Sequence, residues 1–567
     1  MLTKLFLKLF DSHRNLLILS LLILTGCATG PKMGQAINFA KTGQYLAAEQ
    51  EVMKSLPPDG RHKLLHYLEM GMITHLKGEY SRSNQYFDEA ERLAEEFYTT
   101  SLTASVGEIL TDPSLSNYKG FPFENTHINY YKAMNYLATA TDANSSDEEI
   151  DSALVEIRRL NNRLEQQRLQ SGGYKSSKQQ ELDGDNGMKA KMLDFFAQAL
   201  GEQPNANKLH YKDDAFGHYL SGLFFELAND KDSARISYQR AAETYRNGYA
   251  KQYTLGKQPS QQAWYDVAKI MKLDRDYQWR RVSRKNLSNE GQQRLSKLKT
   301  APAELIIIQD LGTMPRRKQM NFRMTLDSYS QSLVLEPMPT GSFTDINEQL
   351  RWFQMLYADT GVFDIVQNYS VGNIGTVVAG AVSKRIPIGP MWGTVESLNM
   401  VKALEYGIRI AVPYYPPLKE NFVKTELHIN GQAKSLLMTG NAINKIALQE
   451  QIRTANREIK ASLTRELVKA VAAQKVADEA GAYGSLLKLA NFTTASTDTR
   501  NWSTLPAEIR FTRIELPEGE HQIELKTYLS NGQMISQHKT VTIKAGKPAL
   551  WHTRTFEPIG ISLASGF

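Results

Sequence analysis

The sequence predicts a multidomain α+β protein, with a helical, repeat-like N-terminal region, a mixed α/β middle and a small antiparallel β-sandwich at the C-terminal end. Two observations carry this prediction. Up to about residue 300, apolar residues recur at intervals of three and four, which is the spacing of amphipathic helices. After about residue 495, short β-branched runs alternate with turns that contain Gly, Pro and Asn. The region between them shows both patterns.

A chain of 567 residues is too long for one hydrophobic core, so several domains are expected. The formal charge of +7 is spread among acidic residues, with no run of five Lys or Arg, so nucleic-acid binding is not expected. The pattern predicts a signal peptide at 1–26, a helical domain at 27–300, a mixed region at 301–440, a long Ala-rich helical segment at 441–495 and a β module at 496–567.

The first 26 residues have the layout of a signal peptide. Lys4, Lys8 and Arg14 precede or flank an apolar run at 16–24. As a helix this run would be about 13 Å long, whereas a bilayer core is about 30 Å thick. The run is therefore too short for an ordinary membrane-spanning helix.

Cys27 is the expected lipid attachment site. Leu24, Thr25, Gly26 and Cys27 together resemble the lipobox of bacterial lipoproteins, in which a peptidase cleaves before the cysteine and the thiol carries a diacylglyceryl group. By analogy with the aspartate rule for inner-membrane retention, Ala28 at the next position favours the outer membrane. Cys27 is the only cysteine, so no intramolecular disulfide can form. A plain signal peptide or an N-terminal anchor helix is the alternative.

The N-terminal helices carry a repeated pattern of small and aromatic residues, with two copies 35 residues apart and a third copy later. Small residues let paired helices approach, and an aromatic ring fills the gap beside them. The copies resemble degenerate tetratricopeptide repeats, and generic helical hairpins of a bundle are the alternative. The residues expected to pack the helix pairs are Gly43, Tyr45, Gly71, Gly78, Tyr80, Phe87, Ala90, Gly222, Ala234 and Tyr238.

Other elements follow from local patterns. Helices are expected at 148–168 and 442–480, and a Gly-, Ser-, Lys- and Asp-rich stretch at 171–186 predicts a mobile loop. A hairpin is expected at 424–437, because Asn-Gly is a preferred two-residue turn. Further strands are expected at 304–308, 332–335, 408–413, 507–516, 520–528, 533–543 and 549–556.

Motifs for catalysis and cofactor binding are absent from the sequence, including the nucleophile elbow, the dinucleotide-binding turn and the phosphate loop. We therefore expect no catalytic residue and no cofactor. His62 and His66 lie four residues apart with Glu69 beyond them, as metal ligands sometimes do. A zinc-protease motif needs glutamate where Lys63 stands, so ordinary surface histidines are favoured and no metal is expected.

Two polar clusters remain. Arg280, Arg281, Arg284 and Lys285 form a basic group, for which a solvated helix face is favoured over contact with phosphate or an anionic headgroup.

Asp498, Arg500 and Trp502 are close enough in sequence to form a corner in which the arginine pairs with the aspartate and the tryptophan caps the β module. A structural corner is favoured over a binding site.

As a set, the sequence features resemble a family of uncharacterised proteobacterial lipoproteins. The resemblance rests on the lipobox, the repeat-like helices, the aromatic segments 118–124 and 129–137, the strand at 304–308 and the segment 498–502. It covers most of the mature chain and implies no known activity. Members tend to be encoded near activators of peptidoglycan synthases.

These observations lead us to expect a non-enzymatic lipoprotein on the periplasmic face of the outer membrane, acting as a protein-interaction scaffold in the cell envelope through its helical half. One alternative is a peptidoglycan- or polysaccharide-associated enzyme, a glycan-binding protein or a synthase regulator. Another is a component of a secretion system or surface appendage.

Overall fold

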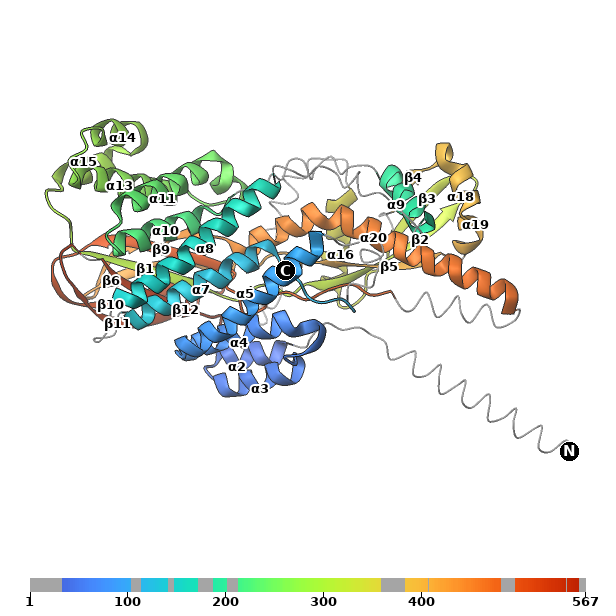
Figure 1. Ribbon diagram of the computed structural model, residues 1–567, viewed down its shortest axis with the longest axis horizontal. Coiled ribbons are helices and arrows are strands. Elements are labelled where there is room, and N and C mark those ends of the chain that lie inside the picture. The colour runs from blue at the N-terminus through green and yellow to red at the C-terminus, as the bar shows by residue number, and fades with distance from the viewer. Residues whose placement is uncertain are drawn as a thin grey trace.

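The computed structural model describes residues 33–102, 114–140, 147–171, 187–200, 213–357, 383–405, 407–480, 495–546 and 548–559. They form a mixed α+β fold with N-terminal helices and three four-stranded sheets (Figure 1). The expected α+β class is confirmed. Cys27 and residues 172–186 of the expected loop lie outside the described residues. No helix in the described ranges is long and apolar enough to cross a bilayer.

The N-terminal helices form an array in which each helix packs against the next one along the chain. Local signals set the helix ends: α4 stops at Gly78, whose φ is +85°, and the side chain of Asp214 caps the first N–H groups of α10. The expected helix at 148–168 is α8. The array comprises α2 (Gly34–Lys41), α3 (Tyr45–Ser55), α4 (Lys63–Lys77), α5 (Tyr80–Leu102), α7 (Pro122–Ala140), α8 (Asp147–Ser171), α10 (Ala215–Leu227), α11 (Lys231–Thr244), α13 (Gln258–Leu273), α14 (Trp279–Asn286) and α15 (Asn289–Lys297).

Two helix pairs close where a glycine faces an aromatic ring. A Cβ atom on Gly71 of α4 would lie 2.6 Å from the ring of Phe87 on α5. A Cβ atom on Gly222 of α10 would lie 2.5 Å from the ring of Tyr238 on α11. Only glycine therefore allows these helices to approach so closely.

The other residues of the repeated pattern lie in turns, at helix starts or in the core. Gly43 and Gly78 stand at turns between helices and have φ values of +75° and +85°. No atom lies within 4 Å of a Cβ atom added to either residue, so the positive φ, and not close packing, favours glycine there. Tyr45 and Tyr80 are half-buried at the starts of α3 and α5. Two alanines, Ala90 and Ala234, are fully buried beside the glycine contacts.

The helical array covers one face of a central sheet with the order β12-β1-β9-β8 (Figure 1). Strand β12 is parallel to β1, and the other pairs are antiparallel. The rings of Phe216 and Tyr219 on α10 lie 5.5 Å and 4.6 Å from the ring of Phe511 on β9. The strands are β1 (Glu304–Leu311), β8 (Met438–Asn441), β9 (Glu508–Glu515) and β12 (Ala549–Thr555).

An outer sheet with the order β11-β10-β6-β7 covers the other face of the central sheet. Leu305 and Ile307 of β1 share a core with Leu427 and Leu525 of this sheet. Strand β1 is thus buried on both faces, which explains its continuous apolar run. The strands are β6 (Phe422–Ile429), β7 (Gln432–Leu436), β10 (Gly519–Leu529) and β11 (Met534–Ile543).

Strands of the segment 496–567 are shared between both of these sheets. Strands β9 and β12 belong to the central sheet, where they flank β1, and β10 and β11 belong to the outer sheet, where β10 pairs with β6. All four strands expected in this segment are present. Strands β10 and β11 pair with each other, but the other partners are β1, β6 and β8, which precede this segment, so the β module and the mixed region build common sheets.

A distal sheet with the order β4-β3-β2-β5 forms the other end of the molecule (Figure 1). The long helix α20 (Ile443–Ala480) starts beside the central sheet and packs against β5 and against α9 (Gly187–Leu200). Helices α16 (Phe343–Tyr357), α18 (Trp392–Ser397) and α19 (Met400–Ala403) belong to this end. The strands are β2 (Lys318–Asp327), β3 (Ser332–Pro337), β4 (Lys384–Pro387) and β5 (Ile408–Tyr414).

Candidate functional site: a charged cleft at the edge of the central sheet

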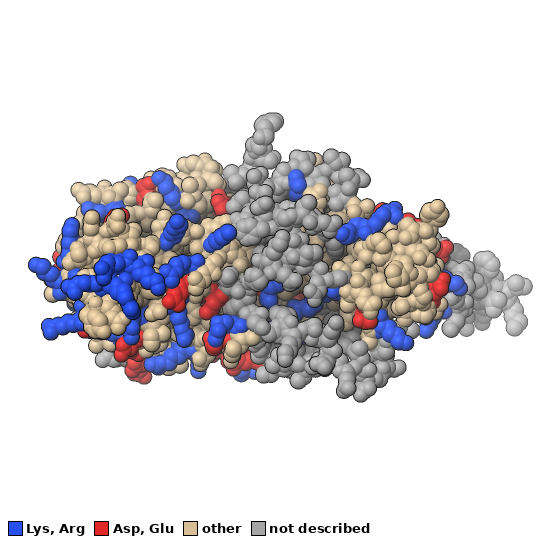
Figure 2. All heavy atoms as spheres, turned by 90° about the horizontal axis from the view of Figure 1, so that it is seen from above, with Lys and Arg blue, Asp and Glu red and all other residues tan. Residues whose placement is uncertain are grey.

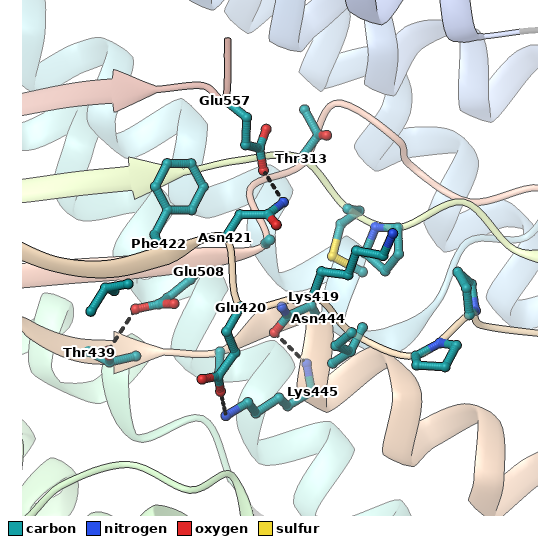
Figure 3. A pocket seen from close by; sticks show the side chains of 18 of the residues that line it. Thr313, Lys419, Glu420, Asn421, Phe422, Thr439, Asn444, Lys445, Glu508 and Glu557 are labelled. Atoms are coloured by element: carbon teal, nitrogen blue, oxygen red, sulfur yellow. Dashed lines mark hydrogen bonds and ion pairs between the residues drawn. The ribbon is translucent and has the colours of Figure 1, made fainter. Parts of the chain in front are cut away.

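A cleft of about 880 Å³ lies at the edge of the central sheet where β1, β8 and β12 end (Figure 3). These strands run in one direction, because β12 is parallel to β1 and both β1 and β8 are antiparallel to β9. Their carboxyl ends therefore meet at one edge. Residues 313–315 follow β1, Ala442 follows β8 and Glu557 follows β12, and all of them line the cleft.

Further segments complete the walls. Asn38 and Lys41 come from α2, residues 254–255 come from the turn before α13, and Lys318 and Glu348 come from β2 and α16. Residues 416–423 connect β5 to the start of β6. The last segment begins with two prolines, whose rings fix φ and restrict the conformation of the segment. The walls of the cleft therefore contain residues from the start of the helical array and from the segments around the sheet edge.

Ion pairs connect these segments across the cleft. Lys41 Nζ lies 3.1 Å from Glu557 Oε2, and Asn421 Nδ2 donates to the other oxygen of Glu557 at 3.4 Å. Lys445 Nζ lies 3.2 Å from Glu420 Oε1. These groups are partly exposed, so they can exchange their present partner for a charged ligand with little loss of Coulomb energy.

Arg510 is a buried cation in the wall of the cleft. Its Nε donates to Glu508 at 2.5 Å, and its Nη2 donates to the carbonyl of Phe422 at 2.7 Å. Thr439 donates to the same carboxylate of Glu508 at 2.7 Å (Figure 3). The Nη1 atom of Arg510 is buried and has no hydrogen-bond partner among the described residues. Such an unsatisfied donor is unusual in a protein interior.

The N-terminus of α20 also borders the cleft, but its own chain satisfies its first N–H groups. Asn444 N–H donates to the carbonyl of Ala507, and the N–H groups of Lys445 and Ile446 both donate to the carbonyl of Ala442. The helix end therefore offers no free anion site, and the polar character of the cleft comes from its side chains.

Apolar side chains stand exposed at the cleft beside these charges. Val423 is 61 % exposed and Ile559 is 52 % exposed. Lys419 is exposed in the same segment as Val423 and forms no ion pair with a residue of the described chain. Charges of both signs together with exposed apolar groups suit the binding of a polypeptide segment.

A buried polar cluster around Asp310 lies between the helical array and the central sheet. Asp310 on β1 accepts hydrogen bonds from Tyr131 at 2.7 Å and from His552 at 3.1 Å. Burial alone would raise the pKa of Asp310, but His552 and Arg554 hold this pKa at about 2. Asp310 is only 1 % exposed, so its role is to join α7 to the sheet.

The histidines considered as metal ligands do not come together with Glu69. His66 is buried, and its Nδ1 lies 2.7 Å from the carbonyl of Leu56. Glu69 is buried among residues of the C-terminal region, and His62 lies in a short 3₁₀ turn before α4. In the part of the chain that the structure describes, no group of three His, Cys, Asp or Glu side chains is arranged to hold a metal ion.

The expected corner lies between the helical array and the central sheet. Arg500 pairs with Asp498 at 2.7 Å and donates to the carbonyls of Arg61 and Ser116. Trp502 is completely buried, and its ring lies 5.7 Å from the ring of Phe87. The arginine–aspartate pair is therefore present, and the tryptophan packs on the helices.

No motif in the sequence indicates the cleft. Its residues are ordinary charged and apolar side chains without a motif, and Lys41 and Glu557 are 516 positions apart. The two consecutive prolines at the start of 416–423 are the one local sign of a fixed loop.

Comparison with known proteins identifies no relative. No family model matches the chain, and no match to it is found among curated proteins or solved structures.

Proposed function

We propose that this protein is a non-enzymatic lipoprotein, held on the periplasmic face of the outer membrane by a lipid on Cys27, and that it acts as a protein-interaction scaffold whose partner binds in the cleft. The observation that carries the proposal is the composition of the cleft. Positively and negatively charged residues line it, and the apolar side chains of Val423 and Ile559 are exposed beside them. A protein segment with charges and one apolar anchor is complementary to such a surface.

The placement of the helical array supports a partner site at the cleft. The face of the array that a superhelix would present to a partner is covered by the chain's own C-terminal region, through contacts such as Phe87 with Trp502 and Tyr219 with Phe511 of β9. The partner surface is therefore assigned to the sheet edge.

We also propose that the array is TPR-like and that the central and outer sheets form a β-sandwich. The spacing of the glycine contacts supports the first point, since Gly71 and Phe87 are 16 residues apart and so are Gly222 and Tyr238. The core shared by Leu305, Leu427 and Leu525 supports the second.

Site-specific crosslinking in the cell tests the function. A photoreactive amino acid at Val423 is expected to form a defined adduct with a partner protein, because this side chain is exposed at the cleft. Tyr329 is the matched control, since it is fully exposed in the turn before β3, at the distal end. Lys419→Glu should weaken the adduct without disturbing the fold, because Lys419 forms no ion pair within the described ranges.

Two outcomes would overturn the proposal. One is the same set of adducts from Val423 and from Tyr329, and the other is no adduct from Val423 at all. If residue 423 crosslinked only to purified peptidoglycan sacculi, the glycan-binding alternative would replace the protein scaffold.

A further inference from the structure

Helix α14 carries a basic group that has no acidic counterpart on its own helix. Arg280, Arg281, Arg284 and Lys285 occupy four of its eight positions, and all of them are exposed. Like charges four residues apart on a helix repel each other, and this helix holds two such pairs. Figure 2 shows Lys and Arg side chains gathered at one end of the molecule, with few acidic side chains among them.

Two exposed arginines on other helices have acidic partners on the same helix. Arg92 pairs with Glu89 and Glu96, and Arg168 pairs with Glu165. On α14, Arg281 donates only to the side chain of Gln278, and Arg284 donates to a main-chain carbonyl. Within the described ranges, none of the four basic side chains of α14 forms an ion pair.

Nearby residues extend the basic group and add aromatic rings. Lys272 and Arg280 lie over the ring of Trp279, at 4.8 Å and 5.1 Å from its centroid. Arg275 is exposed in the turn between α13 and α14, and Tyr277 in the same turn is 79 % exposed. Exposed aromatic rings beside cationic groups are typical of surfaces that contact lipid headgroups.

The acidic residues of this turn are already engaged. Asp274 pairs with Lys231 at 2.8 Å, and Asp276 accepts the main-chain N–H of Gln278 at 2.9 Å. Neither carboxylate forms an ion pair with an arginine of α14.

We propose that the surface formed by Arg275, Tyr277, Arg280, Arg281, Arg284 and Lys285, called the α14 face, docks onto the phosphate groups of anionic membrane lipids. Guanidinium groups bind phosphate oxygens through paired N–H donors, and Tyr277 inserts at the level of the headgroups. Such contacts add to a lipid anchor and fix the orientation of the protein on the membrane. The proposal rests on the envelope location in the proposed function, because only there does the chain meet such a surface.

Vesicle binding tests the α14 face without the anchor. The chain from residue 28 onward, which keeps every described residue and lacks Cys27, is mixed with phosphatidylglycerol-containing or pure phosphatidylcholine vesicles and sedimented. We expect binding to the anionic vesicles only, and weaker binding as salt increases. Replacing Arg280, Arg281, Arg284 and Lys285 with Gln should reduce binding by more than about tenfold.

A charge-matched control removes four exposed lysines elsewhere: Lys402, Lys434, Lys539 and Lys544. This variant should bind like the unmodified chain, and Tyr277→Ala should bind more weakly than Tyr329→Ala. Equal losses in the two quadruple variants would show attraction by net charge alone and overturn the proposal, as would absence of binding to anionic vesicles. Failure of lipidation at Cys27 would be detected separately, by acyl labelling of the full-length precursor.

Discussion

Glu69 on α4 accepts the main-chain N–H of Ser503, 434 residues further along the chain, at 2.7 Å. Its second oxygen accepts the N–H and the hydroxyl of Thr504 at 3.2 Å and 2.5 Å. Glu124 on α7 accepts the N–H of Trp502 at 2.7 Å in the same way. Two buried carboxyl groups of the helical array thus hold the segment that leads into β9, which makes the helices and the sheets one cooperative unit.

This arrangement predicts that Glu69 and Glu124 contribute stability that is lost as pH rises from about 4.5 to about 7. Burial raises the pKa of Glu69 and of Glu124 to about 7, so the folded protein retains two protons that the unfolded chain loses near pH 4.5. Glu69→Gln should flatten this part of the pH profile, measured as the urea midpoint between pH 5 and pH 8. It should also lower the midpoint overall, because the amide nitrogen cannot accept from Thr504.

His75 also contributes to the pH dependence of stability, so the effect of Glu69 has to be measured as a difference between variants. Its burial lowers its pKa to about 4, so it contributes a loss of stability as pH falls from about 6.5 to about 4, opposite in sign to the two glutamates. The exposed Glu290→Gln variant is the control and should keep the profile of the unmodified protein. An unchanged slope in Glu69→Gln would contradict the role given to Glu69.

The glycine contacts predict selective sensitivity to a single methyl group. Gly71→Ala places a Cβ atom 2.6 Å from the Phe87 ring, so the helices must separate, at a cost of about 1–3 kcal/mol in the free energy of unfolding. Gly393→Ala on α18 is the control, since nothing lies within 4 Å of its Cβ position and alanine favours a helix. Denaturation with urea measures both. Equal stability of the two variants would exclude a packing role for Gly71.

A buried ion cluster predicts a larger loss. Arg513 on β9 contacts Glu226, Asp266 and Glu304 at 2.7, 3.3 and 2.5 Å, and its side chain is fully buried. Arg513→Met removes a positive charge that neutralises these carboxylates, so it should lower the free energy of unfolding by about 3–5 kcal/mol.

The surface pair of Arg168 with Glu165 is the control for Arg513. Arg168→Met should change stability by less than about 1 kcal/mol. A similar small effect of Arg513→Met would mean that Lys269, which lies 2.8 Å from Glu304, already neutralises the cluster.

Local chemistry made much of the fold predictable. The uninterrupted apolar residues of β1 predict a strand buried on both sides, and Asn430 with Gly431 predicts the β6–β7 turn because both residues adopt positive φ, +50° and +80°. The local sequence pattern does not predict strand β2. It contains Gln, Asn and Arg and no valine or isoleucine, and it is a strand because β3 and β5 pair with it on both sides.

Local sequence patterns also do not predict the candidate site, because it depends on contacts between distant segments of the chain. Lys41 and Glu557 meet only because β12 returns parallel to β1 and because α2 packs at that edge, and neither relationship leaves a periodic signal in the sequence. The same holds for Arg500, whose pairing with Asp498 is local and predictable, whereas its bonds to the carbonyls of Arg61 and Ser116 depend on the tertiary fold.

The lipid anchor gives the last prediction. If the lipobox ending at Cys27 is processed, Cys27→Ala should leave a precursor that keeps residues 1–26 and takes up no labelled fatty acid, because the chain has no other thiol. Cys27→Ser is the matched variant: its hydroxyl is close in size to the thiol but is a much weaker nucleophile, so it should also remain unlabelled. Metabolic labelling with palmitate followed by separation of precursor from mature protein measures both effects. Labelled mature protein from either variant would show that the anchor lies elsewhere.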